Sequence, residues 1–167
     1  MATAQTHRTE PAAGAQAQWR APFTVGQVLD LPIPFTPESV RAFATMTNDT
    51  NPLHHDAAFA AKTRFGGLIA SGTHTTGLLL GSLAHHIFPE HASLGLECSF
   101  RLRKAVPANA SLIARWTVRT VVPKPSLAGV IVTLDGGLVA ADGTVFVEGS
   151  ATIAVMPPEA LLSGGGA

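Results

Sequence analysis

Residues 73–87 constrain the fold most, because they are apolar almost all round and only small polar residues interrupt the leucines. A helix with this pattern has no polar face, so we expect the rest of the chain to bury it. About fifteen residues are fewer than the roughly 20 that a bilayer requires, which indicates a core helix and not a membrane span. Gly77 and Gly81 predict a flat stripe on which a sheet backbone can lie close.

After this helix the pattern changes to a two-residue period, which is typical of strands with one face on a core and one wetter face. Apolar and polar residues alternate over 94–102 and, in part, over 111–119. We expect the apolar side chains of the first run to share the core face, and the lone cysteine to be a small buried hydrophobe there. These side chains are Leu94, Leu96, Cys98, Phe100 and Leu102.

The end and the beginning of the chain complete the predicted sheet. Residues 130–140 and 144–155 predict a hairpin, because the Asp-Gly pair between them is a strong tight-turn signal. Residues 23–28 predict a short edge segment, and Pro32 and Pro34 exclude a central strand directly after it. The pattern favours an α+β fold, in which an antiparallel sheet wraps around one long central helix.

A shorter helix is predicted before the core helix. Thr36 followed by Pro37 is typical of a helix start, with an N-cap hydroxyl and proline at the first helical position. The helix should end near Asn48, because Pro52 disfavours the helical conformation of the residue before it. Its inward face should contain Val40, Phe43, Ala44 and Thr47.

The strongest chemical signal is Asp49 and His54, which lie on either side of an Asn-Pro turn. Five residues apart on a straight helix their side chains would diverge, whereas across a turn they can converge and share a water molecule. Alternatively, Asp49 is a turn residue and His54 a half-buried surface group. Asp56 is a good N-cap for a short helix over 57–62, whose Phe59 should pack inward.

This run resembles the MaoC-like dehydratase family, which includes the R-specific enoyl-CoA hydratases. The matching positions are Thr47, Asp49, Asn51, Pro52, Leu53, His54 and Asp56, followed by the apolar stretch that ends in Ser71-Gly72. Asn48 stands where the family usually has glycine, and Ser71 where a histidine often precedes the glycine. The resemblance covers about residues 23–155 and implies the hot-dog fold.

The resemblance implies a hydratase or dehydratase that acts on the 2,3 double bond of an enoyl thioester. Asp49 would be the base that activates water, and His54 would hold that water and supply or relay a proton. The N–H of Gly72, at a helix N-terminus, would stabilise the charge on the thioester carbonyl. Ser71 would either hydrogen-bond near the site or cap the helix.

Other residues are expected to support the loop or the carrier. Asn51 and Pro52 would fix the site loop, whereas His55 has no assigned role, so that His55→Ala should keep most activity. Phosphates of coenzyme A, or an acyl carrier protein, would meet cations at the rim of the site; the alternative is that these are ordinary solvated charges. The candidate cations are Arg103, Lys104 and Lys124.

Other functions fit these residues less well. Ser71 and His74 lack the G-x-S-x-G pattern of hydrolases. A hot-dog thioesterase usually has an acidic residue on its central helix, and residues 73–87 contain no Asp or Glu. A catalytically silent acyl-binding subunit is a further alternative. No metal or other cofactor is expected, because no second ligand cluster accompanies His85, His86 and His91.

The composition limits the classes of partner that we expect for this chain. With 46% hydrophobic residues, 13% charged residues and 11 residues of each sign, the chain should bury surface in a homodimer or higher homo-oligomer. Balanced charge argues against nucleic acid, and no membrane contact is expected. The single cysteine and the lack of a signal peptide favour the cytoplasm. We expect one domain over 22–156, between flexible tails at 1–21 and 157–167.

Overall fold

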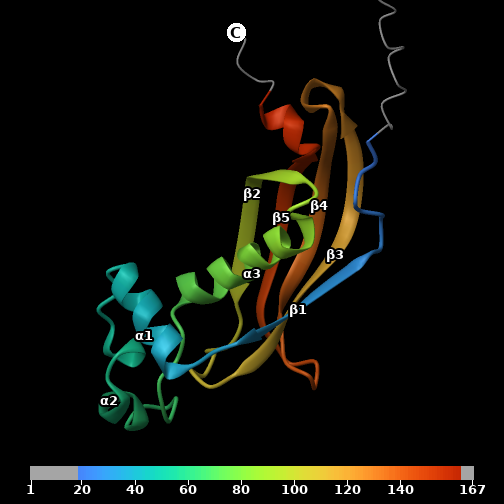
Figure 1. The fold of residues 1–167 in the computed structure, drawn as a ribbon. Helices are drawn as coiled ribbons and strands as arrows, with labels where there is room; N and C mark the ends of the chain where they lie inside the picture. Colours follow the sequence, from blue (N-terminus) through green and yellow to red (C-terminus); the bar gives the residue numbers. More distant parts are fainter. Residues whose placement is uncertain (1–18, 163–167) are drawn as a thin grey trace, which may run out of the picture.

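The computed structural model describes residues 19–162, in which one antiparallel five-stranded sheet has the strand order β1-β3-β4-β5-β2 (Figure 1). The strands are β1 (Val28–Pro34), β2 (Ala92–Leu102), β3 (Ser111–Lys124), β4 (Gly129–Val139) and β5 (Val145–Met156). The α-helices are α1 (Pro37–Met46), α2 (Ala57–Ala61) and α3 (Gly72–Ile87). Three short 3-10 helices, η1 (Pro52–His54), η2 (Pro125–Leu127) and η3 (Pro158–Leu161), complete the described elements.

The long helix α3 lies across one face of the sheet, as the sequence predicts (Figure 1). Leu79, Leu83 and Ile87 are its buried apolar residues. The indole of Trp116, on β3, is fully buried and donates hydrogen bonds from Nε1 to the Leu79 carbonyl at 3.1 Å and to Ser82 Oγ at 3.0 Å. Because buried polar atoms need partners, these bonds fix one depth and rotation of α3 on the sheet.

The start of α1 follows the predicted capping. The hydroxyl of Thr36 accepts a bond from the Ser39 N–H, Ser39 Oγ accepts one from the Thr36 N–H, and proline follows the cap. The helix ends at its C-cap Thr47, and the next residue, Asn48, has a left-handed φ of 55°. Asparagine tolerates this conformation better than most residues other than glycine, which explains its use here. Thr47 itself is exposed, so the expected inward face stops at Ala44.

Two packing predictions about the helices were wrong. Phe59 is 45% exposed, because the five-residue α2 presents the small, buried Ala60 to the fold instead. Gly77 and Gly81 are exposed and do not contact the sheet. A Cβ at Gly81 would meet no atom within 4 Å, and one at Gly77 would meet only the Phe43 ring. The sheet covers the opposite side of α3, so this glycine stripe remains open in the single chain.

A β-bulge in β2 overturns the predicted uniform alternation. The register with β5 shifts between Gly95 and Glu97. Before the bulge, Ala92 and Leu94 lie opposite Met156 and Ala154, on the outer face where Ala92, Ala154 and Met156 form a small cluster. After the bulge, side-chain parity changes, because one extra residue shifts every following side chain to the other face.

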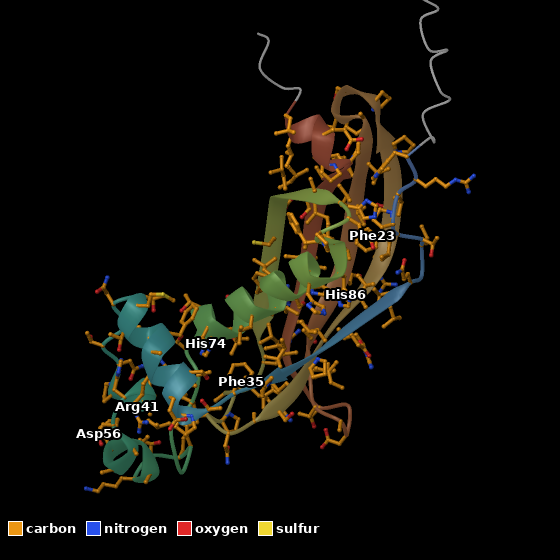
Figure 2. All side chains as sticks on the ribbon, in the orientation of Figure 1. Phe23, Phe35, Arg41, Asp56, His74 and His86 are labelled. Carbon is orange, nitrogen blue, oxygen red and sulfur yellow. The ribbon has the colours of Figure 1, made fainter. Side chains whose placement is uncertain are left out.

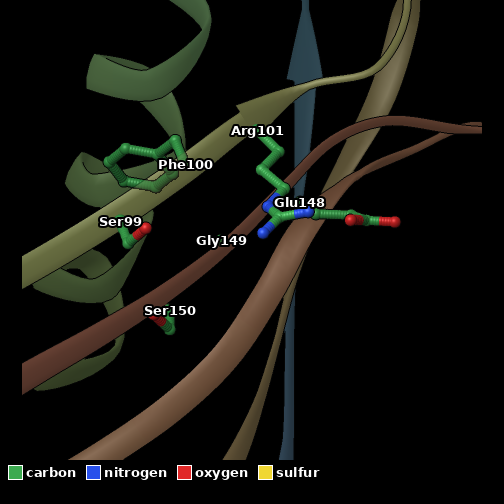
Figure 3. Close-up of a pocket in the computed structure, with 6 residues that line it drawn as sticks. All are labelled: Ser99, Phe100, Arg101, Glu148, Gly149 and Ser150. Atoms are coloured by element: carbon green, nitrogen blue, oxygen red, sulfur yellow. The ribbon is translucent and has the colours of Figure 1, made fainter.

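The residues after the bulge lie toward α3 without being buried by it. Phe100 pairs with Gly149, over which its ring packs, and Figure 3 shows Phe100 and Arg101 on opposite sides of β2. Leu102 is 57% exposed, and Cys98 is a free, exposed thiol. The prediction of a buried Cys98 was therefore wrong, because β2 is an edge strand with no neighbouring strand on its outer side within residues 19–162.

Other expectations about strands were confirmed or shifted. Strands β4 and β5 form the predicted hairpin, with Gly143 at φ 83° and the Thr144 N–H donating to the Asp142 carboxylate. The edge strand near the N-terminus is β1 itself, five residues after the predicted start, and it contains both prolines. Among residues 19–162, no helix is long and apolar enough to cross a membrane.

The predicted tails fall mainly on residues 1–18 and 163–167, outside the described residues, and their boundaries stay predictions. Trp19 contacts the fold through a hydrogen bond from Nε1 to His91 Nδ1 at 3.2 Å. At the other end, Ala160 of η3 packs against the outer-face cluster of β2 and β5. Both contacts lie just beyond the limits expected for the domain.

Candidate active site

The carboxylate of Asp49 is positioned by the end of α1. Its backbone N–H donates to the Ala44 carbonyl at 2.8 Å, directly after the left-handed turn at Asn48. Its Oδ1 accepts a bond from the Asn51 N–H at 3.1 Å. The other oxygen, Oδ2, therefore points away from the loop and lies 3.4 Å from His54 Nε2.

The imidazole of His54 is held in one orientation and one tautomer. It is buried at the end of η1, whose N-cap is Asn51 and whose first residue is Pro52. The Asn51 side chain accepts from the Leu53 N–H, as expected of a residue that supports the loop. His54 Nδ1 lies 2.8 Å from the Ile69 carbonyl, which can only accept, so Nδ1 carries the hydrogen.

The pair thus presents two acceptors to one small volume. In the neutral ring Nε2 has a lone pair, and it faces an anionic carboxylate that is about one third exposed. Neither atom can satisfy the other directly, whereas a water molecule can donate one hydrogen to each. The arrangement is therefore suited to hold and polarise a water molecule beside the cavity.

A cavity of about 280 Å³ has His54 in its wall and reaches the N-terminus of α3, whereas Asp49 is not one of its lining residues. His54, Gly72, Thr75 and Leu102 contribute to its wall. Ser71 is buried and caps the helix through Oγ, which accepts from the His74 N–H at 3.2 Å and contacts Thr73 Oγ1 at 3.2 Å. Of the two expected roles of Ser71, the structure shows the helix cap, and its contact with a substrate stays a prediction.

The first backbone donors of α3 remain available. Among the described residues, the N–H groups of Gly72 and Thr73 have no hydrogen-bond partner, as expected for the first turn of a helix. A Cβ at residue 72 would lie 2.7 Å from Leu102 Cδ1. The absence of a side chain at Gly72 therefore makes room for Leu102 of β2, a reason for glycine that the sequence did not suggest.

The three predicted rim cations separate in space. Arg103 and Lys104 line the cavity, but Arg103 donates from Nε and Nη2 to Glu148 Oε2, at 2.9 and 2.7 Å. Lys124 lies at the other end of β3 from Ser111, roughly 40 Å along the strand at about 3.3 Å per residue. Lys124 is therefore not brought to this cavity within the chain, because β3 runs away from the site.

A cation that the sequence did not single out lies at the same cavity. Arg64 lines it, with its guanidinium 4.9 Å from the centre of the Phe65 ring. Its position just before the Gly-Gly pair that leads to the core helix was a signal that could have been used. A separate, shallow pocket of about 170 Å³ on β2 and β5 contains neither Asp49 nor His54 in its wall (Figure 3).

His74 is a second residue whose place only the structure shows. Its ring is buried at the α1 end of α3, stacked 4.5 Å from Phe43 and edge-on to Phe35 (Figure 2). Burial lowers the pKa of His74, and positive charge on His54 lowers it further. Its Nδ1 has no partner, and its side chain does not bond Ser71, which leaves the hydrolase reading without a Ser-His pair.

The remaining histidines divide into two groups. His85 and His86 lie in the last turn of α3, and no group of three or more His, Cys, Asp or Glu residues in the described part of the chain could hold a metal ion. His55 instead contacts the site, because its Nε2 lies 2.6 Å from the backbone carbonyl oxygen of Asp49. This contact was not expected from the sequence.

Comparison with known proteins gives concordant matches. Residues 21–130 match the family model described as MaoC like domain. An (R)-specific enoyl-CoA hydratase of Aeromonas caviae is 41% identical over 80 residues, which are 47% of this chain and 59% of that protein, so the match spans less than two thirds of that relative. A 3-hydroxybutyryl-CoA dehydratase of Methylorubrum extorquens (strain AM1) is 30% identical over 110 residues, 65% of this chain and 69% of that protein. The solved structure of the (R)-hydratase from A. caviae involved in PHA biosynthesis aligns with a TM-score of 0.69 at 30% identity, over 86% of this chain and all of that chain.

Proposed function

The chain belongs to the MaoC-like domain family and has a hot-dog fold, and from this premise we propose that it is a hydratase or dehydratase of enoyl thioesters. The observation that carries the proposal is the 3.4 Å approach of Asp49 Oδ2 to His54 Nε2 beside a cavity. The activities for which the two relatives are named, hydration and dehydration of coenzyme A thioesters, agree with this chemistry.

In the hydration direction, Asp49 and His54 hold one water between them. The water oxygen forms a bond to the β-carbon of the enoyl thioester while the Asp49 carboxylate takes a proton from that water. His54, whose Nε2 starts without a hydrogen, accepts this proton from Asp49 and relays it to the α-carbon, so that H and OH add across the double bond and the pair regains its starting protonation. The reverse sequence removes water, since both directions share one transition state.

Negative charge grows on the thioester oxygen during this addition, and the start of α3 is placed to receive it. The N–H groups of Gly72 and Thr73 have no partner among the described residues and lie at the positive end of a sixteen-residue helix. Donors that are fixed before the reaction stabilise such charge without reorganising. We assign the carbonyl site to this turn, with Leu102 as the wall that faces it.

The carrier is proposed to be coenzyme A, bound at the rim by Lys104 and Arg64. Both line the cavity, and neither forms an ion pair with a carboxylate within residues 19–162. Arg103 is already neutralised by Glu148. A phosphate-bearing carrier is thus expected to draw on the two unpaired cations first.

A homodimer is proposed because one edge of the sheet is open. The edge strand β1 contains Pro32 and Pro34, which lack the N–H needed for pairing. The other edge, β2, has no proline and exposes Leu94, Leu96 and Leu102. Antiparallel pairing of β2 with the β2 of a second copy would cover these side chains around a two-fold axis.

The function is tested with a panel of enoyl-coenzyme A thioesters of different acyl length. Hydration removes the conjugated thioester absorbance without releasing a thiol, whereas a thioesterase releases free coenzyme A that a thiol reagent detects. We expect loss of absorbance without thiol, and a single stereoisomer of the hydrated product. Thiol release, or no turnover of any member of the panel, would reject the proposal in favour of the thioesterase or of a silent acyl-binding subunit.

A further inference from the structure

We infer that His55 is a positioning residue for Asp49, and that this role explains the second histidine of the His-His-Asp sequence. The inference rests on the proposed function, because it concerns how the catalytic carboxylate is held. His55 does not line the cavity next to His54. Its role would be exerted through the backbone of Asp49, whose carbonyl oxygen lies 2.6 Å from His55 Nε2.

The direction of this hydrogen bond is fixed by chemistry. A backbone carbonyl only accepts, so His55 Nε2 must carry a hydrogen, and the neutral ring with hydrogen on Nε2 is sufficient. The bond spans six residues and closes the loop that contains Asn51 and Pro52. The two ends of the catalytic segment, Asp49 and His54-His55, are thereby tied at a point other than the reacting atoms.

The backbone of His55 is itself anchored. Its backbone carbonyl accepts a bond from Arg41 Nε at 3.1 Å, and Arg41 belongs to α1, whose end positions Asp49 (Figure 2). The backbone N–H of His55 donates to the Pro52 carbonyl at 3.2 Å. His55 is half-buried, so its bond to Asp49 competes less with water than an exposed contact would.

Asp49 needs such support because its other contacts do not hold its backbone carbonyl. Its N–H is fixed by Ala44 and its Oδ1 by Asn51, but Asn51 lies on the same exposed loop and moves with it. The His55 bond holds the carbonyl, and with it the peptide plane between Asp49 and Thr50. Displacing a catalytic group by about 1 Å can cost up to 100-fold in rate, so a backbone bond at this residue affects turnover directly.

The test uses two amides that differ only in reach. The side-chain nitrogen of Gln can occupy the place of His Nε2 and donate to the Asp49 carbonyl, whereas that of Asn is one carbon too short. We expect His55→Gln to keep kcat within about 2-fold of the unchanged protein, and His55→Asn to lower kcat about 10-fold with KM changed less than about 2-fold. This proposal differs from the expectation from sequence that His55→Ala keeps most activity.

If His55 had a purely structural role, its replacement would lower the stability of the protein but would not produce this difference in kcat between the Gln and Asn variants. Thermal melts and circular dichroism are therefore recorded for both variants, and activity is referred to folded protein. If His55→Asn does not fold, Arg41→Lys replaces it, because it removes the Nε donor to the His55 carbonyl and should also lower kcat with little change in KM. Equal kcat in the Gln and Asn variants, or a loss that appears only in KM, would overturn the inference.

Asp49→Asn, assayed in parallel, distinguishes a failure of the positioning role of His55 from a failure of the proposed function. If Asp49→Asn is inactive while His55→Asn is fully active, the positioning role fails and the proposed function stands. If Asp49→Asn retains normal turnover, the proposed use of Asp49 fails, and the role of His55 fails with it.

Discussion

Replacing Asp49 by Asn tests the central contact with the smallest structural change. The amide oxygen can still accept the bond from the Asn51 N–H, now 3.1 Å from Oδ1, so the loop keeps its local hydrogen bond. What disappears is the negative charge and the base. The amide NH₂ would take the place of Oδ2, which lies 3.4 Å from His54 Nε2. It could donate a hydrogen bond to the lone pair of Nε2, because the hydrogen of the neutral ring is on Nδ1, next to the Ile69 carbonyl.

The expected loss follows from this geometry. The variant converts a site with two acceptors into a donor-acceptor pair that satisfies itself, so no water is held for attack. Positioned acid-base groups contribute about 100-fold or more, which corresponds to about 2.7 kcal/mol in the barrier. We expect kcat to fall at least ~100-fold, and His54→Ala to show a loss of the same order.

Asp56→Asn is the matched control, because the chemical change is the same. Asp56 caps α2 through Oδ1, which accepts from the Phe59 N–H at 2.9 Å, and Asn caps helices about as well. Turnover is followed by loss of the enoyl thioester absorbance, and folding by circular dichroism. Near-normal turnover in folded Asp49→Asn, or an equal loss in Asp56→Asn, would contradict the role of Asp49 as the base.

The remaining predictions concern the carrier, the assembly and pH. Lys104→Ala should raise KM for a coenzyme A thioester about 2- to 5-fold, the range expected for an exposed ion pair, and should leave KM for a truncated thioester unchanged. Lys124→Ala is the control, because Lys124 lies far along β3, and it should change neither KM value. Light scattering should show a dimer, and the substitution Leu96→Lys should dissociate it. A stable, active monomer of the unchanged protein would contradict dimerisation through the open edge strand β2. Because burial lowers the pKa of His74, the unfolded chain binds a proton that the folded chain does not, so the free energy of unfolding should fall as pH drops below about 6.5. The variant His74→Phe can keep the stacking on Phe43 but has no group that titrates there. Thermal melts between pH 7.5 and about pH 5, which is well below the ordinary histidine pKa, should show a smaller loss of stability in this variant than in the unchanged protein, and an equal loss would contradict this assignment.

Much of the chain could be interpreted from the sequence because the signals are local. Thr36 and Pro37 specify a helix start through their own hydroxyl and ring, and the Asp-Gly pair at 142–143 specifies a tight turn. The approach of Asp49 to His54 was predicted for the same reason, since both lie within one short segment that turns at Asn51 and Pro52. The apolar run of α3 likewise required a covering sheet whatever the order of the strands.

The tertiary structure decided what depends on partners distant in sequence. The bulge in β2 arises from its register with β5, whose partner residues lie 55 to 58 positions further along the chain, and no local pattern marks which residue is extra. The direction of β3 separates Lys124 from Lys104, while the loop before α3 brings Arg64 to the same cavity. The exposed side of α3 is set by where the sheet ends, and therefore Gly77 and Gly81 remain open.

The same division holds within the site. The sequence predicted Asp49 and His54 as the residues that carry the chemistry, because a carboxylate and an imidazole are recognisable by type and spacing. The tautomer of His54 depends on the Ile69 carbonyl, the need for glycine at 72 depends on Leu102, and the contact of His55 depends on how the loop folds back on Asp49. Each of these is a matter of distance and direction between atoms, which residue type and spacing leave undetermined until the chain is packed.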